Sequence, residues 1–106
     1  MKAARLRPLA KADLDDQAVY YAEVAGADRG DDFLDTALAA LKLLEEQPGI
    51  ASPRWNPPGQ VPPLRAWRLG RYPFLWFYFE GDDHIDVVRL LGEREDIAAI
   101  LAHGPD

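Results

Sequence analysis

The segment FLWFYFE, from Phe74 to Glu80, limits what this chain can fold into more than any other part of the sequence. Side chains along a strand point alternately to its two faces. Both alternate sets are apolar here: Phe74, Trp76 and Tyr78 on one face, and Leu75, Phe77 and Phe79 on the other. A strand of this kind is covered on both sides, which predicts an inner strand of a sheet.

Two further strands are predicted next to this one. Residues 64–70 (LRAWRLG) precede it across a turn at 71–73, and residues 84–91 (HIDVVRLL) follow it across a turn at 81–83. Links this short join antiparallel neighbours, so the three strands form a meander. Residues 3–9 alternate loosely and end near a proline, which predicts a short strand at the edge of the sheet.

A first helix is predicted over LAKADLDDQAVYYAEVA, because its apolar residues return at helical spacing and Gly26 ends the pattern. Asp13, Asp15 and Asp16 lie near its expected start, where the macrodipole favours carboxylates. The sequence therefore predicts a helix directly after the first strand.

A second helix is predicted to begin at Asp28 or Asp31 and to run to about Gln47, before Pro48 and Gly49. Its apolar stripe holds Phe33, Leu34, Ala37, Leu38, Leu41 and Leu44. Two amphipathic helices with so short a link form an antiparallel hairpin, and each must bury its stripe against another element.

Together these elements predict one α+β domain over residues 1–106. A small antiparallel sheet, made of the N-terminal edge strand and the three-stranded meander, packs on the helical hairpin. Asp96 is expected to cap a short C-terminal helix. Five prolines between Ile50 and Pro63 predict an irregular connection, in which Trp55 packs over an edge of the core. The hairpin covers only one face of the sheet, so the other must be met by the C-terminal helix, by a partner chain or by both.

The composition is that of a single folded domain. The chain has 106 residues, of which 48% are hydrophobic and 10% aromatic, enough for one modest core. With no cysteine, disulfide bonds, thiolate chemistry and cysteine-built zinc sites are excluded. The sequence has no apolar run of ~18 residues and no apolar segment behind its basic start, so we expect a cytoplasmic protein without a membrane span or secretory signal.

The formal net charge of −6 disfavours broad binding to nucleic-acid phosphates, and we expect no direct sequence-specific DNA binding by this chain. All basic residues after Ile50 are arginines, whose planar guanidinium suits carboxylates and phosphates better than lysine does. They are Arg54, Arg65, Arg68, Arg71, Arg89 and Arg94. They can be solvated or internally paired charges, or contacts to a partner.

The order of these elements resembles the RelE/ParE superfamily of bacterial type II toxins over essentially the whole chain. Three pieces carry the resemblance: ADLDDQAVYYAE, FLDTALAALKLLEEQPG and LRAWRLGRYPFLWFYFEGDDHIDVVRLLGERED. It implies a toxin that is neutralised by a cognate antitoxin, whose C-terminal segment wraps it. It also implies one of two activities, because RelE-like members cleave mRNA in the ribosome and ParE-like members poison gyrase without a reaction of their own.

The groups that RNA cleavage needs are depleted in this chain. The reaction requires deprotonation of the 2′-OH, stabilisation of the phosphorane charge and protonation of the leaving oxygen. Gly92 stands where many of these toxins carry histidine, Glu93 and Glu95 add negative charge, and the loop and meander contain no lysine. His84 and His103 are interpreted as solvated residues, with a general base at either histidine or at either glutamate as the alternative.

We therefore expect a ParE-like toxin that inhibits DNA gyrase or another topoisomerase, with no catalytic residue, cofactor or metal. One alternative is a RelE-like ribosome-dependent mRNA endoribonuclease that uses Arg89, Arg94 and Tyr78. Another is an inactive relic that only binds the antitoxin.

In the leading hypothesis the antitoxin crosses an uncovered sheet face and the helical hairpin. The residues expected to contact the antitoxin or the target are Arg65, Trp67, Arg68, Arg71, Trp76, Tyr78, Arg89 and Arg94. Buried aromatic and arginine anchors usually dominate such interfaces. The competing interpretation for Arg89 is an internal ion pair with Asp86 or Asp96.

Overall fold

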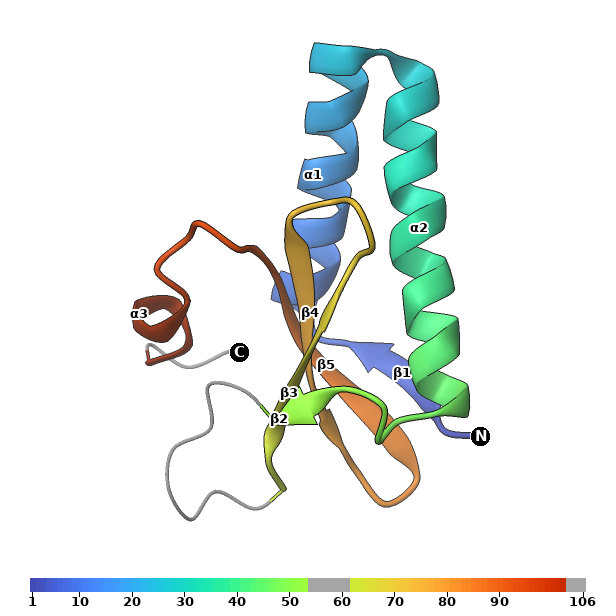
Figure 1. Cartoon of the computed structure of the whole chain (residues 1–106), viewed down its shortest axis with the longest axis vertical. Coiled ribbons are helices and arrows are strands. Elements are labelled where there is room, and N and C mark those ends of the chain that lie inside the picture. Colours follow the sequence, from blue (N-terminus) through green and yellow to red (C-terminus); the bar gives the residue numbers. More distant parts are fainter. Residues whose placement is uncertain (54–61, 103–106) are drawn as a thin grey trace.

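The computed structural model of the chain describes residues 1–53 and 62–102. Predictions for Arg54, Trp55 and His103 concern residues outside this part. The elements follow in the predicted order, with two long helices side by side and the strands below them (Figure 1). Their bounds are β1 Ala3–Leu6, α1 Pro8–Ala25, α2 Ala27–Glu46, β2 Ser52–Pro53, β3 Leu64–Arg68, β4 Phe74–Glu80, β5 His84–Gly92 and α3 Ile97–Ala102. None of the helices in the described part is both long and apolar enough to span a membrane.

The sheet has five strands in the order β1-β5-β4-β3-β2. The antiparallel meander of β3, β4 and β5 is confirmed. The first strand differs from the expectation, because β1 pairs in parallel with β5, from Ala3 opposite His84 to Leu6 opposite Val87. The sheet is therefore mixed rather than wholly antiparallel, and β2 adds a short strand that the proline-containing segment did not predict. Alternation reveals a strand but not the direction of its neighbour.

Both helices of the hairpin begin earlier than predicted, and the link between them is shorter. Pro8 begins α1 instead of marking the end of a strand, because a proline at the first helical position gives up no hydrogen bond. Asp13 consequently lies beyond the first turn of α1, so it does not act on the helix macrodipole as predicted. Gly26 alone separates the two helices, with φ +98°, and α2 begins at Ala27 rather than at Asp28 or Asp31.

Gly30 on α2 lies at a close approach of the two helices. A Cβ atom at this position would lie 2.8 Å from the Ala22 Cβ and 2.9 Å from the Ala18 carbonyl oxygen. Such distances are shorter than ordinary packing contacts. The missing side chain is therefore what lets α1 and α2 form one closely packed layer.

The sheet separates two apolar clusters. The helix-side cluster includes Trp76 and Tyr78 of β4 with Phe33 and Leu44 of α2 and Leu14 of α1. The tail-side cluster includes Leu75 and Phe77 of β4, Val88 and Leu91 of β5, and Ile97 of α3, with Ile100 and Leu101 packed against it. Figure 1 shows α3 on the other side of the strands from α2. One residue of the apolar stripe predicted for the second helix does not face the core, because Leu38 is 47% exposed.

The sequence left open whether the C-terminal helix, a partner chain or both cover the second sheet face. In the structure the chain's own C-terminal helix covers it. Asp96 caps it as predicted, since its side chain accepts a hydrogen bond from the Ala99 N–H at 3.2 Å. Phe77 is fully buried and Leu75 nearly so. The expectation that β4 shows an uncovered apolar face is therefore wrong for this conformation.

Candidate partner-binding site

Trp76 and Tyr78, two of the predicted contact residues, lie in the core beneath the helices. Both side chains are fully buried. The Trp76 indole N–H donates to the Ala37 carbonyl at 3.0 Å, and the Tyr78 hydroxyl donates to the Pro48 carbonyl at 2.6 Å. Burial, which disfavours the charged phenolate, raises the pKa of Tyr78 to about 12. Both residues thus stabilise the fold and present no surface to a partner in this structure.

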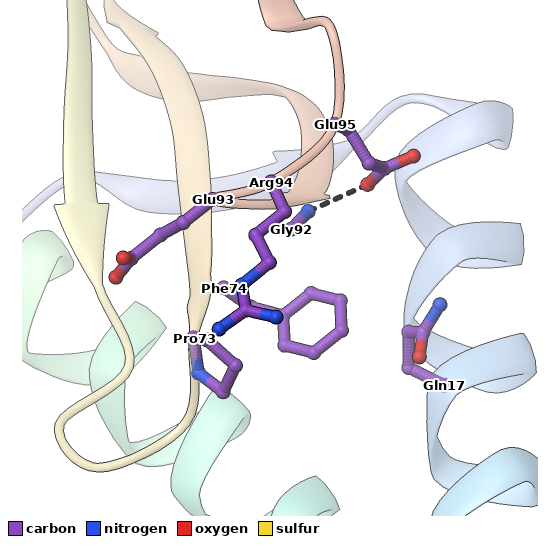
Figure 2. A pocket seen from close by; sticks show the side chains of 7 residues that line it. All are labelled: Gln17, Pro73, Phe74, Gly92, Glu93, Arg94 and Glu95. Carbon is purple, nitrogen blue, oxygen red and sulfur yellow. Dashed lines mark hydrogen bonds between the residues drawn. The ribbon is translucent and has the colours of Figure 1, made fainter.

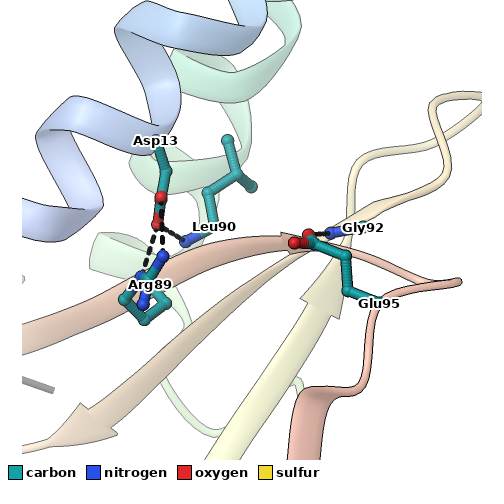
Figure 3. Close-up of polar contacts among 5 residues, drawn as sticks. All are labelled: Asp13, Arg89, Leu90, Gly92 and Glu95. Atoms are coloured by element: carbon teal, nitrogen blue, oxygen red, sulfur yellow. Dashed lines mark hydrogen bonds and ion pairs between the residues drawn. The ribbon is translucent and has the colours of Figure 1, made fainter. Parts of the chain in front are cut away.

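Arg89 joins the sheet to α1 instead of facing a partner (Figure 3). Its Nε and Nη2 atoms donate to the two carboxylate oxygens of Asp13 at 2.7 and 2.9 Å. The Leu90 backbone N–H donates to the same carboxylate at 3.0 Å. This bidentate pair is mostly buried, with 19% and 16% of the two side chains exposed. An internal pair was foreseen for Arg89, but its acid is Asp13.

The two acids expected as partners of Arg89 are engaged elsewhere. Asp86 accepts hydrogen bonds from Arg7 at 2.8 and 2.6 Å, which fastens β1 to β5. Asp96 caps α3. Sequence reasoning missed Asp13 as the partner of Arg89, because its position near the expected helix start was already explained by the helix macrodipole. The sequence feature that could have identified this partner is the position of Asp13 immediately before Leu14, at the border of the apolar stripe of α1.

Three further predicted arginines lie at or near the β3 strand, and each has an internal acceptor. Arg65 donates to the Ala51 carbonyl at 2.6 Å. Arg68 donates to Glu93 and to the Gly70 carbonyl. Arg71 donates to Asp32 at 2.5 Å. Trp67 is half-buried and packs against the helix-side cluster. Arg68 and Arg71 nevertheless stay well exposed, so a partner can reach them.

Asp32 of α2 holds the β3–β4 turn, residues 69–73, against the helix layer. Its carboxylate accepts hydrogen bonds from the Tyr72 hydroxyl and from Arg71. The bond from Tyr72, and then the bond from Arg71, lower the pKa of the Asp32 carboxyl. The Tyr72 ring also meets the Phe33 and Tyr21 rings at centroid distances of 5.0 and 5.2 Å. The turn is thereby fixed in place rather than left as a loose loop.

A pocket opens beside this turn, where α1, the start of β4 and the end of β5 meet (Figure 2). Its volume is about 570 Å³, and it is widely open to solvent. It is lined by Gln17, Pro73, Phe74, Gly92, Glu93, Arg94 and Glu95. We call it the Arg94 pocket. Its residues come from three separate segments, so sequence reasoning could single out Arg94 but not the pocket.

The segment after β5 is anchored on both sides of Arg94. The Glu93 N–H donates to the Pro73 carbonyl at 2.9 Å, and the Glu95 carboxylate accepts from the Gly92 N–H at 2.6 Å (Figure 3). A Cβ atom at Gly92 would lie 3.4 Å from that carboxylate and 3.5 Å from the Phe74 ring. Both distances are ordinary van der Waals contacts, so a side chain at this position would touch both groups.

The structure does not gather the three residues of the endoribonuclease alternative around this pocket. Arg94 lines it, whereas Arg89 is held by Asp13 and the Tyr78 hydroxyl is buried against Pro48. His84 places its Nδ1 atom 2.7 Å from Asp83 in the β4–β5 turn. Within residues 1–53 and 62–102, no three acidic or histidine side chains are grouped so that they could hold a metal ion.

A solved structure described as "Chromosomal ParDE TA system from P. aeruginosa" superimposes with a TM-score of 0.70 at 22% identity, covering 87% of this chain and 96% of that chain. At this identity the likeness shows the fold alone. A search of curated proteins found no match.

The family is shown by the sequence itself. A family model described as "ParE toxin of type II toxin-antitoxin system, parDE" matches residues 4–97. The chain therefore belongs to the ParE toxin family of type II toxin–antitoxin systems. This membership confirms the resemblance read from the sequence, and it implies an antitoxin partner.

Proposed function

We propose that this toxin inhibits DNA gyrase or another topoisomerase by binding it, without a reaction of its own, and that its antitoxin neutralises it by direct contact. The state of the groups that could transfer protons supports the non-catalytic part. Burial raises the pKa of the Tyr78 hydroxyl to about 12, Arg68 engages Glu93, and the Gly92 N–H engages Glu95. A general acid or base needs a pKa near the working pH and access to the substrate.

The surface that best suits the antitoxin lies at one end of the molecule, where the β3–β4 turn, the segment after β5 and α1 meet. Arg68, Arg71 and Arg94 are exposed there. Tyr20 and Val24 of α1 are also exposed, each by more than half. A surface that combines arginines with exposed apolar side chains suits a partner segment that carries acidic and apolar residues.

The first experiment is a supercoiling assay of purified gyrase with this toxin at stoichiometric excess. We expect loss of supercoiling, and recovery when the toxin is first mixed with its antitoxin. A second topoisomerase is assayed in parallel. Unchanged activity of both enzymes would contradict the proposed target, while inhibition that the antitoxin fails to relieve would contradict the proposed neutralisation.

The same toxin preparation is tested for mRNA cleavage by primer extension on an actively translated message. We expect no new 5′ ends. Toxin-dependent cuts inside codons would instead establish the endoribonuclease alternative. If the chain leaves growth unaffected when it is expressed without antitoxin, the inactive relic is the correct interpretation.

A further inference from the structure

Arg94 differs from the other described arginines of the meander and its flanking turn. Arg65, Arg68, Arg71 and Arg89 each donate to an acceptor within the chain. Arg94 makes no hydrogen bond or ion pair with the described residues, and it is exposed. No side chain or carbonyl in the described part of the chain holds its guanidinium, which is therefore available to a ligand.

The two glutamates beside Arg94 do not satisfy it. Glu93 turns toward β3, where it accepts from Arg68, and Glu95 folds back to accept from the Gly92 N–H. Figure 2 shows the Arg94 side chain extending in the direction of Pro73 and Phe74, away from both carboxylates. The pocket thus offers the N–H donors of a guanidinium beside the apolar Pro73 and Phe74, although Glu93 and Glu95 also line it.

The apolar side of the pocket continues along α1. Phe74 faces Tyr21, with ring centroids 6.3 Å apart, and Tyr21 meets Tyr20 at 5.6 Å. Tyr20 is 54% exposed, and Val24, one helical turn further along, is 60% exposed. These residues extend the Arg94 pocket into an apolar row on the helix surface.

We propose that the Arg94 pocket receives an acidic side chain of the antitoxin, with a neighbouring apolar side chain of the same segment resting on Phe74 and Pro73. This inference rests on the proposed neutralisation by direct contact. A carboxylate forms two parallel hydrogen bonds with a guanidinium. The bonds are stronger beside Phe74 and Pro73 than in open water, because the apolar side chains keep water from competing.

The chemistry of the pocket favours a carboxylate of a protein segment. Glu93, Glu95 and the net charge of −6 repel any anion, but they oppose the many phosphates of a nucleic acid far more than the single carboxylate of a protein side chain, which pairs with the Arg94 guanidinium. The pocket and the row on α1 form one strip, which a flexible segment laid along α1 fills from end to end.

The test measures binding of the cognate antitoxin to full-length toxin variants by calorimetry. Arg94→Ala is expected to weaken binding at least tenfold and Arg94→Glu further, while Arg94→Lys loses less because it keeps the charge but not the fork. The matched control is Arg5→Ala, which removes an exposed arginine of β1 and should change affinity less than twofold. Thermal unfolding of each variant should match wild type, since Arg94 has no hydrogen-bond or ion-pair partner within residues 1–53 and 62–102.

A charge-swap experiment then identifies the acid. Each Asp or Glu of the antitoxin's toxin-binding segment is changed to Lys in turn. One of these antitoxin variants should bind the Arg94→Glu toxin at least tenfold more tightly than the wild-type antitoxin does. Wild-type affinity in Arg94→Ala would overturn the inference while leaving neutralisation by contact intact. Failure of wild-type toxin to bind the antitoxin would instead refute the proposed function. Loss of gyrase inhibition in Arg94→Ala with unchanged antitoxin affinity would assign the pocket to the target and overturn the inference.

Discussion

The two sides of the sheet are buried equally well but by very different covers. Trp76 and Phe77 are neighbours on β4 that point to opposite sides, and both are fully buried. Helices of 18 and 20 residues cover Trp76, whereas Phe77 lies in the cluster that the six-residue α3 closes. A helix this short is unstable by itself and depends on packing. Burial alone therefore does not tell how firmly a face is closed.

The largest expected effect is on the helix side. Trp76→Ala should lower the free energy of unfolding by about 3–5 kcal/mol, because it removes a buried indole and leaves a cavity under α2. Urea denaturation monitored by circular dichroism measures it. Tyr20→Ala, at an exposed site on α1, should stay within about 0.5 kcal/mol of wild type. A loss below about 1 kcal/mol in Trp76→Ala would show that the two-helix cover yields easily.

A smaller effect tests whether that cover is one rigid layer. Gly30→Ala should cost about 1–3 kcal/mol, because the new methyl group cannot fit against Ala22 and the Ala18 carbonyl without moving the helices apart. Gly49→Ala is the control, since a Cβ atom there meets open space. Equal unfolding midpoints for the two variants would mean that α1 and α2 slide apart without cost.

The tail side should respond differently. Truncation of a buried isoleucine normally costs about 2–5 kcal/mol. Ile97→Ala should cost only about 1 kcal/mol in global stability, because the loss cannot exceed the small free energy that docks α3. Hydrogen exchange followed by mass spectrometry should show faster exchange in α3 and unchanged exchange in α2. Ala98→Ser, at an exposed position of α3, is the control. Uniformly faster exchange would make both covers one cooperative unit.

The smallest effect, absent at neutral pH, concerns alkaline stability. Burial raises the pKa of Tyr78 to about 12, so the folded state keeps the neutral phenol while the unfolded state ionises near pH 10. Stability should hold below about pH 10 and fall as the pH rises toward 12. Tyr78→Phe should show a shallower decline. Part of the decline remains, because burial also raises the pKa values of Tyr21 and Tyr72. Identical pH profiles for wild type and Tyr78→Phe would contradict this account.

The sequence was sufficient for the parts of the fold that depend on local pattern. The meander follows from three apolar segments joined by turns of a few residues, and Gly26 and Asp96 mark helix ends through their own backbone chemistry. The pairing of β1 could not be read in this way. Its partner is 81 positions away at Ala3 and His84, and no local pattern specifies a parallel neighbour.

The candidate site was predicted less well because it depends on pairings across the fold. Arg89 and Arg94 are five positions apart, and both were predicted to contact a partner. The structure gives Arg89 to Asp13, far away along the chain, and leaves Arg94 beside a pocket. Trp76 and Tyr78 were interpreted as contact residues because two apolar faces suggested a missing cover. The helical hairpin covers the face that carries both residues, and α3 covers the other face.

The parallel seam between the first and the last strand has a consequence for how the protein is made. β1 pairs with residues 84–87, and the ion pairs of Lys2 with Glu80 and of Arg7 with Asp86 span 78 and 79 positions. A ribosome must synthesise residues 84–87 before β1 can find its neighbour. A nascent chain that stops before His84 cannot pair β1 with β5, so β1 must wait unpaired while the intervening elements are made.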